Sequence, residues 1–146
     1  MTTNKTNAVT IESHLWECDE RFSPQLSVRL DISEYSHKLA TLADRFEVWQ
    51  GNRLVGFVAA YLNNTGTCYG FVSSVSICKD CEGKGLASKL MRKCILVATG
   101  KGCETLELAV GKSDQRAQAF YLKHGFVSSA DGKDGFMLMR LKLVQK

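Results

Sequence analysis

The spacing of apolar residues changes twice along this chain, and each change limits the folds that it can adopt. From Ile32 to Phe46 the apolar side chains recur at helical spacing, which predicts a helix. Between residues 46 and 77 they alternate, which predicts three strands. From Leu86 the helical spacing returns. This succession of helical, extended and helical segments favours a layered α/β architecture with a mixed sheet.

Local signals place the ends of these elements. Asp31 and Glu34 form a capping-box pair at the start of the long N-terminal helix. Gly51 and Asn52 predict a tight turn between the first two strands, and "NNTG" at 63–66 predicts a turn before the third. The remaining predicted elements are a short helix at 10–22, a helix at 86–98 ended by glycines, a strand at 105–110, a helix at 113–124 and a strand at 135–143.

Length and composition exclude several classes of protein. The 146 residues fit a single domain, 1–146, and a chain with 45% hydrophobic and 23% charged residues is not disordered. The net charge of +4 comes without a basic block, so we expect no nucleic-acid partner. No apolar run is long enough for a signal peptide or a membrane span, so we expect a cytoplasmic protein with no membrane partner. In that compartment the six cysteines would be reduced thiols.

The segment "ICKDCEGKGLASKL", residues 77–90, allows two interpretations. Cys78 and Cys81 form a C-x-x-C pair, which is typical of metal binding or thiol redox chemistry. Gly83 and Gly85 precede a helix whose first N–H groups lack internal partners, so an anion such as phosphate could approach the backbone there. Lys84 could add a full positive charge. Taken alone, the segment leaves both interpretations open.

A second motif favours the phosphate interpretation. Together, "VSICKDCEGKGLASKLM" at 75–91 and "LELAVGKSDQRAQAFYLKHGF" at 106–126 resemble the GNAT superfamily of acyl-CoA-dependent acyltransferases. The resemblance implies an α/β (α+β) fold with a mixed, mostly antiparallel central sheet flanked by helices in three α/β/α layers. It also implies an N-acetyltransferase that uses acetyl-CoA as co-substrate, needs no metal, and acetylates a primary amine by direct attack in a ternary complex.

The resemblance implies roles for individual residues. The backbone of Val75 and Ile77 would pair with the pantetheine arm, as an added strand does. Tyr121 would protonate the departing thiolate as the catalytic acid. A backbone N–H of the strand before the glycine loop would polarise the thioester carbonyl. The other implied cofactor contacts are the backbone amides of Gly83, Lys84, Gly85, Leu86 and Ala87, which would hold the pyrophosphate, and the side chains of Ala117 and Phe120.

Two acidic residues depart from the family pattern. Glu82 stands where the family usually has Arg or Gln, so it would repel the pyrophosphate if it pointed inward. Asp114 replaces the usual Asn at a cofactor-binding position, although Asp remains a good N-cap for the helix that follows. These departures keep a catalytically silent acyl-CoA-binding protein open as an alternative.

The favoured interpretation is that the acceptor is a small-molecule amine, because the chain is compact. The alternative is a protein or peptide amine. Glu47 and Glu107 are candidate bases, with a water chain as a substitute, and His14 is expected to be exposed. Similar proteins are often homodimers, with the final strand as a contact. The resemblance offers seven residues for the acceptor pocket: His14, Trp16, Glu17, Asp19, Tyr35, Trp49 and Tyr61.

The C-x-x-C pair then falls beside the cofactor loop. Zinc binding is disfavoured, because Cys94 and Cys103 do not supply a second C-x-x-C. A reversible disulfide between Cys78 and Cys81 is a sharper hypothesis, since a thiol near a helix start can be acidic.

Overall fold

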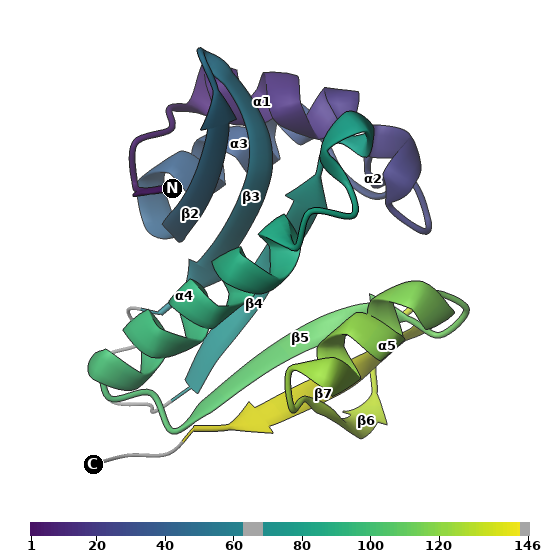
Figure 1. Cartoon of the computed structure of the whole chain (residues 1–146). Coiled ribbons are helices and arrows are strands. Elements are labelled where there is room, and N and C mark those ends of the chain that lie inside the picture. The colour runs from purple at the N-terminus through teal and green to yellow at the C-terminus, as the bar shows by residue number, and fades with distance from the viewer. Residues whose placement is uncertain (63–68, 144–146) are drawn as a thin grey trace.

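A computed structural model describes residues 1–62 and 69–143 of the chain (Figure 1). The "NNTG" turn and Cys68 lie outside these residues. The strands are β1 Thr2–Thr3, β2 Asp44–Gln50, β3 Arg53–Tyr61, β4 Tyr69–Ile77, β5 Thr105–Gly111, β6 Val127–Asp131 and β7 Phe136–Lys142. The α-helices are α1 Ala8–Glu17, α2 Leu26–Arg29, α3 Ile32–Leu42, α4 Leu86–Gly100 and α5 Gln115–Lys123, and the 3-10 helices are η1 Asp19–Arg21 and η2 Lys79–Cys81.

The strands form a seven-stranded sheet in the order β1-β2-β3-β4-β5-β7-β6. All neighbouring strands are antiparallel except β4 and β5, which are parallel. These two pair only through residues 69–71 and 105–107, and beyond that point they diverge (Figure 1). The sheet therefore opens between the C-terminal halves of β4 and β5.

Helices cover both faces of the sheet. On one face α1 and α3 pack on Leu54, Phe57 and Ala59 of β3. On the other face α4 buries Leu90 and Met91 against β2, β3 and β5, with α5 beside it over β5 and β7. This arrangement confirms the predicted three-layer α/β/α fold with a mostly antiparallel sheet. Among the described residues, no helix combines the length and apolarity that crossing a bilayer requires.

Two predicted helix ends are wrong. The first helix was expected to reach residue 22, but α1 ends at Glu17 and the 3-10 helix η1 follows it. The helical spacing placed Phe46 on the same helix as Leu42, but α3 ends at Leu42 and Phe46 belongs to β2. Phe46 is fully buried in the core beneath α4. Phe46 lies four positions after Leu42, which is a helical spacing. The same side chain also faces the core if the helix has ended and a strand has begun. Spacing alone could not separate the two cases.

Four of the described elements were not predicted from the sequence: β1, α2, β6 and the 3-10 helix η2. β1 and α2 are too short to show a period. β6 is exposed at every position, so it carries no alternation of apolar and polar residues. Because β6 pairs with β7, the final strand lies inside the sheet rather than at its edge.

Candidate functional site

Two cavities of about 340 Å³ each lie at the opening between β4 and β5. The first is bounded by the end of β4, the start of α4 and α5, and the second by α2, α3 and the diverging parts of β4 and β5. They are contiguous, since six residues line both: Arg21, Phe22, Val75, Asp114, Ala117 and Tyr121. A ligand in one cavity would therefore face a ligand in the other across these side chains.

The first cavity brings together ten of the eleven predicted site residues. Lys84 is the exception, because it is exposed and does not line the cavity. The ten are Val75, Ile77, Gly83, Gly85, Leu86, Ala87, Asp114, Ala117, Phe120 and Tyr121.

The start of α4 is open to this cavity. α1, α3 and α5 each have an N-cap side chain that accepts a hydrogen bond from the first turn, whereas Gly85 caps α4 without one. Gly83 and Gly85 have φ angles of 77° and 73°, a left-handed conformation that favours glycine. A Cβ at either position would meet no atom within 4 Å. The first-turn N–H groups of α4 are thus available to an anion, and the space in front of them is clear.

The edge of β4 beside the opening also has free backbone groups. The Cys78 N–H donates to the Val55 carbonyl at 2.8 Å, so that residue faces β3. Backbone groups in an antiparallel pair alternate in direction, so those of Val75 and Ile77 face away from β3. β5 no longer pairs with β4 at this level. Both residues can therefore hydrogen-bond to an extended ligand.

Glu82 lines the first cavity, but its charge is compensated. Arg116 contacts its Oε2 at 2.5 Å, and Arg21 forms an ion pair with its Oε1. Although partial burial acts to raise the pKa of Glu82, the hydrogen bond from Arg116 and the charge of Arg21 hold it below its usual value. Two guanidinium groups around one carboxylate leave a net positive charge, so this departure from the family pattern does not make the site repel anions.

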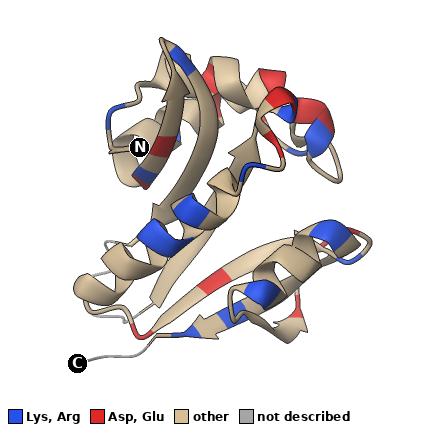
Figure 2. Cartoon of the chain, viewed as in Figure 1, with Lys and Arg blue, Asp and Glu red and all other residues tan. Residues whose placement is uncertain are grey.

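The helices beside the first cavity are basic. α4 carries Lys89, Arg92 and Lys93, α5 carries Arg116 and Lys123, and neither helix holds an acidic residue (Figure 2). Together with the α4 N-terminus, these side chains produce a positive potential on this face of the molecule.

Tyr121 stands where the two cavities meet. Its ring packs edge-on against Phe120 and Phe126, with centroids 5.4 Å and 5.9 Å away. No hydrogen bond joins its hydroxyl to any other residue that the structure describes. Burial and, to a smaller extent, the charge of Asp114 raise the pKa of Tyr121 above its usual value of about 10. The phenol is therefore protonated at neutral pH and free to donate to a ligand.

Asp114 has the structural role that the sequence predicted. Its Oδ1 accepts a hydrogen bond from the Ala117 N–H at 3.1 Å, which caps α5. It also contributes a carboxylate to the lining of both cavities.

Arg21 and Phe22, which line both cavities, were not predicted. Both residues belong to the connection between α1 and α2, which crosses to the end of β5. The two segments come so close there that a Cβ on Gly111 would lie 2.8 Å from the Ser23 carbonyl oxygen. No sequence motif marks such an approach between residues almost ninety positions apart.

Of the seven residues expected around the acceptor, only Tyr35 lines the second cavity. Its hydroxyl donates to the Ser73 carbonyl at 3.0 Å, and burial raises its pKa to about 12. The other six line neither cavity. His14 is buried, so the expectation that it is exposed was wrong, and Trp16 is exposed to solvent. The remaining four have partners elsewhere: Glu17 pairs with Arg53, Asp19 accepts hydrogen bonds from Ser27, Trp49 donates to Thr2, and the Tyr61 ring lies beneath Lys38.

Neither candidate base reaches the cavities. Glu47 is fully buried and accepts hydrogen bonds from Thr2, Lys5 and Thr6, so it anchors the N-terminal segment. Glu107 pairs with Arg140 at 2.9 Å. Both carboxylates have structural partners and are absent from the lining of either cavity.

The two thiols of the C-x-x-C pair have different neighbours. The Cys81 sulfur accepts a hydrogen bond from Gln50 at 3.3 Å, whereas the Cys78 sulfur lies beside Cys18 and His14. Burial raises the pKa of Cys78, so the expectation of an acidic thiol is wrong for this residue.

Comparisons with known proteins agree on one family. A model of the acetyltransferase (GNAT) family matches residues 8–126. No curated protein matches the chain. The solved structure of PaiA N-acetyltransferase from Thermoplasma acidophilum in complex with coenzyme A is 14% identical, with a TM-score of 0.70 over 97% of this chain and 98% of that one.

Two other solved structures share the fold. A GNAT family acetyltransferase from Elizabethkingia anophelis with acetyl-CoA bound is 16% identical, with a TM-score of 0.63 over 75% of this chain and 82% of that one. Ribosomal-protein-alanine N-acetyltransferase from Brucella melitensis is 13% identical, with a TM-score of 0.74 over 98% of this chain and 100% of that one. At these identities the likeness shows the fold alone.

Proposed function

Because the chain belongs to the GNAT acetyltransferase family, we propose that residues 1–146 form one domain that transfers an acetyl group from acetyl-CoA to a primary amine of a small molecule. The observation that carries the proposal is the position of Tyr121, which lines both contiguous cavities and whose hydroxyl has no hydrogen-bond partner among the described residues. One cavity would hold the acetyl donor and the other the amine.

The first cavity fits acetyl-CoA. The uncapped start of α4, with the amides of Leu86 and Ala87, would bind the pyrophosphate, and the backbone of Val75 and Ile77 would pair with the pantetheine arm. The basic helices α4 and α5 would attract the phosphates. Acetyl-CoA supplies an acetyl group activated as a thioester, which an unprotonated amine can attack directly.

The chain's residues then have two tasks in the reaction. A backbone N–H of β4 at the opening polarises the thioester carbonyl. Tyr121 donates its phenolic proton to the sulfur as the carbon–sulfur bond breaks, and the nitrogen releases its own proton to solvent. The raised pKa of Tyr121 keeps the phenol in the donating form before each turnover.

The second cavity supports a small acceptor with a negatively charged group. Its volume of about 340 Å³ lies in the lower part of the range for small-molecule pockets. Arg29 lines it, with the guanidinium 5.0 Å from the Phe136 ring centroid, and pairs with no carboxylate among the described residues. A carboxylate or phosphate on the acceptor would pair with Arg29 while the amine faces Tyr121.

Calorimetric titration with acetyl-CoA, followed by an acceptor screen, tests the proposal. We expect micromolar binding and turnover with small amines that carry an anionic group. Binding without turnover on small amines or peptides would identify a silent acyl-CoA binder, and turnover on peptides alone would overturn the acceptor class. Absence of binding would refute the assignment of the first cavity.

A further inference from the structure

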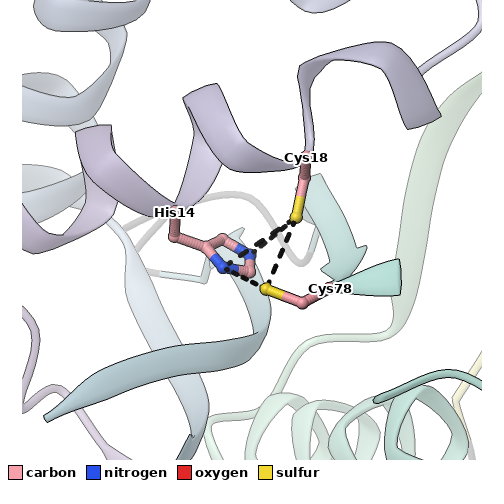
Figure 3. Close-up of side chains that lie close together, drawn as sticks. All are labelled: His14, Cys18 and Cys78. Carbon is pink, nitrogen blue, oxygen red and sulfur yellow. Dashed lines mark hydrogen bonds between the residues drawn. The ribbon is translucent and has the colours of Figure 1, made fainter. Parts of the chain in front are cut away.

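A buried cluster of metal-ligating side chains lies outside both cavities. His14 of α1, Cys18 directly after α1 and Cys78 directly after β4 converge in the interior (Figure 3). Both cysteines are fully buried, and His14 is 2% exposed. The Cys18 and Cys78 sulfurs are 3.9 Å apart, and they lie 4.0 Å and 3.6 Å from His14 Nδ1.

These separations match the edges of a metal coordination polyhedron. Points equidistant from three atoms at such distances lie about 2.2 Å from each in their plane and slightly further out of it, close to the ~2.3 Å and ~2.0–2.1 Å of zinc–sulfur and zinc–nitrogen bonds. We propose that His14, Cys18 and Cys78 form a zinc site. Two soft thiolates and one imidazole in a buried position select zinc over the hard cations, which take oxygen ligands.

Glu17, the residue before Cys18, would supply the fourth ligand by turning from Arg53 toward the three side chains. One of its carboxylate oxygens lies within 4.8 Å of the Cys78 sulfur. The charges balance in this arrangement. Two thiolates neutralise the zinc, with two protons released to solvent, and Arg53, which is paired with Glu17, neutralises the remaining carboxylate.

His14 has the outer contact that a zinc ligand needs. Its Nε2 lies 2.8 Å from Ser76 Oγ, so with the proton on Nε2 the ring donates to that hydroxyl and leaves the Nδ1 lone pair for the metal. Nδ1 now faces the Leu54 carbonyl at 2.9 Å, and the Cys18 sulfur lies 3.8 Å from Nε2, so the imidazole must rotate on binding and exchange that hydrogen bond for the metal bond. The ion would join the end of α1 to the end of β4, one residue before η2 and the glycine loop.

Metal titration of the reduced, chelator-treated whole chain tests the site. Competition with a chromophoric chelator should give one zinc per chain with a dissociation constant below micromolar. Cobalt in place of zinc should give thiolate-to-metal charge-transfer absorption, and zinc should raise the unfolding midpoint. Failure to take up one equivalent, or a cobalt spectrum without thiolate bands, would overturn the proposal.

Variants identify the ligands. Cys18→Ser and Cys78→Ser should each weaken zinc binding at least a hundredfold and, at saturating cobalt, lower the intensity of the thiolate bands by about half. Cys94→Ser is the matched control, because Cys94 is equally buried but belongs to α4 and packs in a different core cluster. Equal binding by the three variants would refute the assignment, and the wild-type cobalt spectrum decides the question even if a variant fails to fold.

Discussion

Replacing Tyr121 by Phe removes one hydroxyl from the boundary between the two cavities and leaves the ring in place. The contacts with Phe120 and Phe126 belong to the ring, and no described residue hydrogen-bonds to the hydroxyl. The free energy of unfolding should therefore change by less than about 1 kcal/mol. A large change in turnover would then be chemical in origin.

The size of the kinetic effect follows from the proton transfer. General acid catalysis typically contributes about 10²–10⁴-fold. A thiol has a pKa of about 8.5, and burial holds the pKa of Tyr121 above about 10, so the phenol is a weaker acid than the thiol that it creates. Because this pKa difference makes the proton transfer unfavourable, we expect the loss in kcat to lie at the lower end of that range, about a hundredfold or ~2.7 kcal/mol.

The pH profile gives a second check. The phenol is the active form, and its proton is lost only as the pH rises through the raised pKa. Titration of Tyr121 should therefore cause no loss of wild-type rate between about pH 7 and pH 9.5.

The assay should follow free coenzyme A by chromatography, because the chain has six cysteines that could react with thiol reagents. Tyr61→Phe is the matched control, since the Tyr61 hydroxyl is buried without a hydrogen-bond partner among the described residues and Tyr61 lines neither cavity. We expect full activity from that variant. If Tyr121→Phe kept more than about a third of the wild-type kcat with unchanged acetyl-CoA affinity, the acid assignment would be wrong.

Four further substitutions test the electrostatics and shape of the site, and Gly51→Ala serves as the control for one of them. Glu82→Gln releases two arginines, so coenzyme A should bind several-fold more tightly and with a steeper salt dependence in calorimetry; weaker binding would mean that the carboxylate mainly positions the guanidinium groups. Gly85→Ala forces alanine to a φ of 73°, at a cost of about 1 kcal/mol, and places a methyl group before the α4 amides, so affinity should fall at least tenfold. Gly51→Ala introduces a similar strain in the β2–β3 turn, so it should lower the unfolding midpoint and leave coenzyme A affinity unchanged. Asp114→Asn keeps the cap of α5, so stability should stay within about 0.5 kcal/mol while coenzyme A affinity rises; a large loss of stability in thermal melts would contradict this. Arg29→Gln should raise KM at least tenfold for an anionic amine and leave KM for a neutral amine unchanged; equal effects on both would remove Arg29 from acceptor recognition.

The repeating pattern of apolar residues was enough to predict most of the sheet and its helices. Helical spacing from Leu86 and the alternating burial along β4 depend on neighbours a few residues apart, so a single sequence reports them. The glycine loop could also be predicted, because the φ angles of Gly83 and Gly85 are a local property. Segments without a repeating pattern of apolar residues could not be predicted in this way. β6 is an example, because it is exposed at every position.

The tertiary structure decided which side chains share a site. The ion pair that compensates Glu82 brings Arg21 from one end of the chain and Arg116 from the other, and no local pattern links them. The C-x-x-C spacing suggested Cys81 as the partner of Cys78, yet the fold gives Cys78 the neighbours Cys18 and His14. Hydrophobic periodicity determines the elements because it acts within them, whereas the chemistry of a site depends on contacts between elements, which only packing brings together.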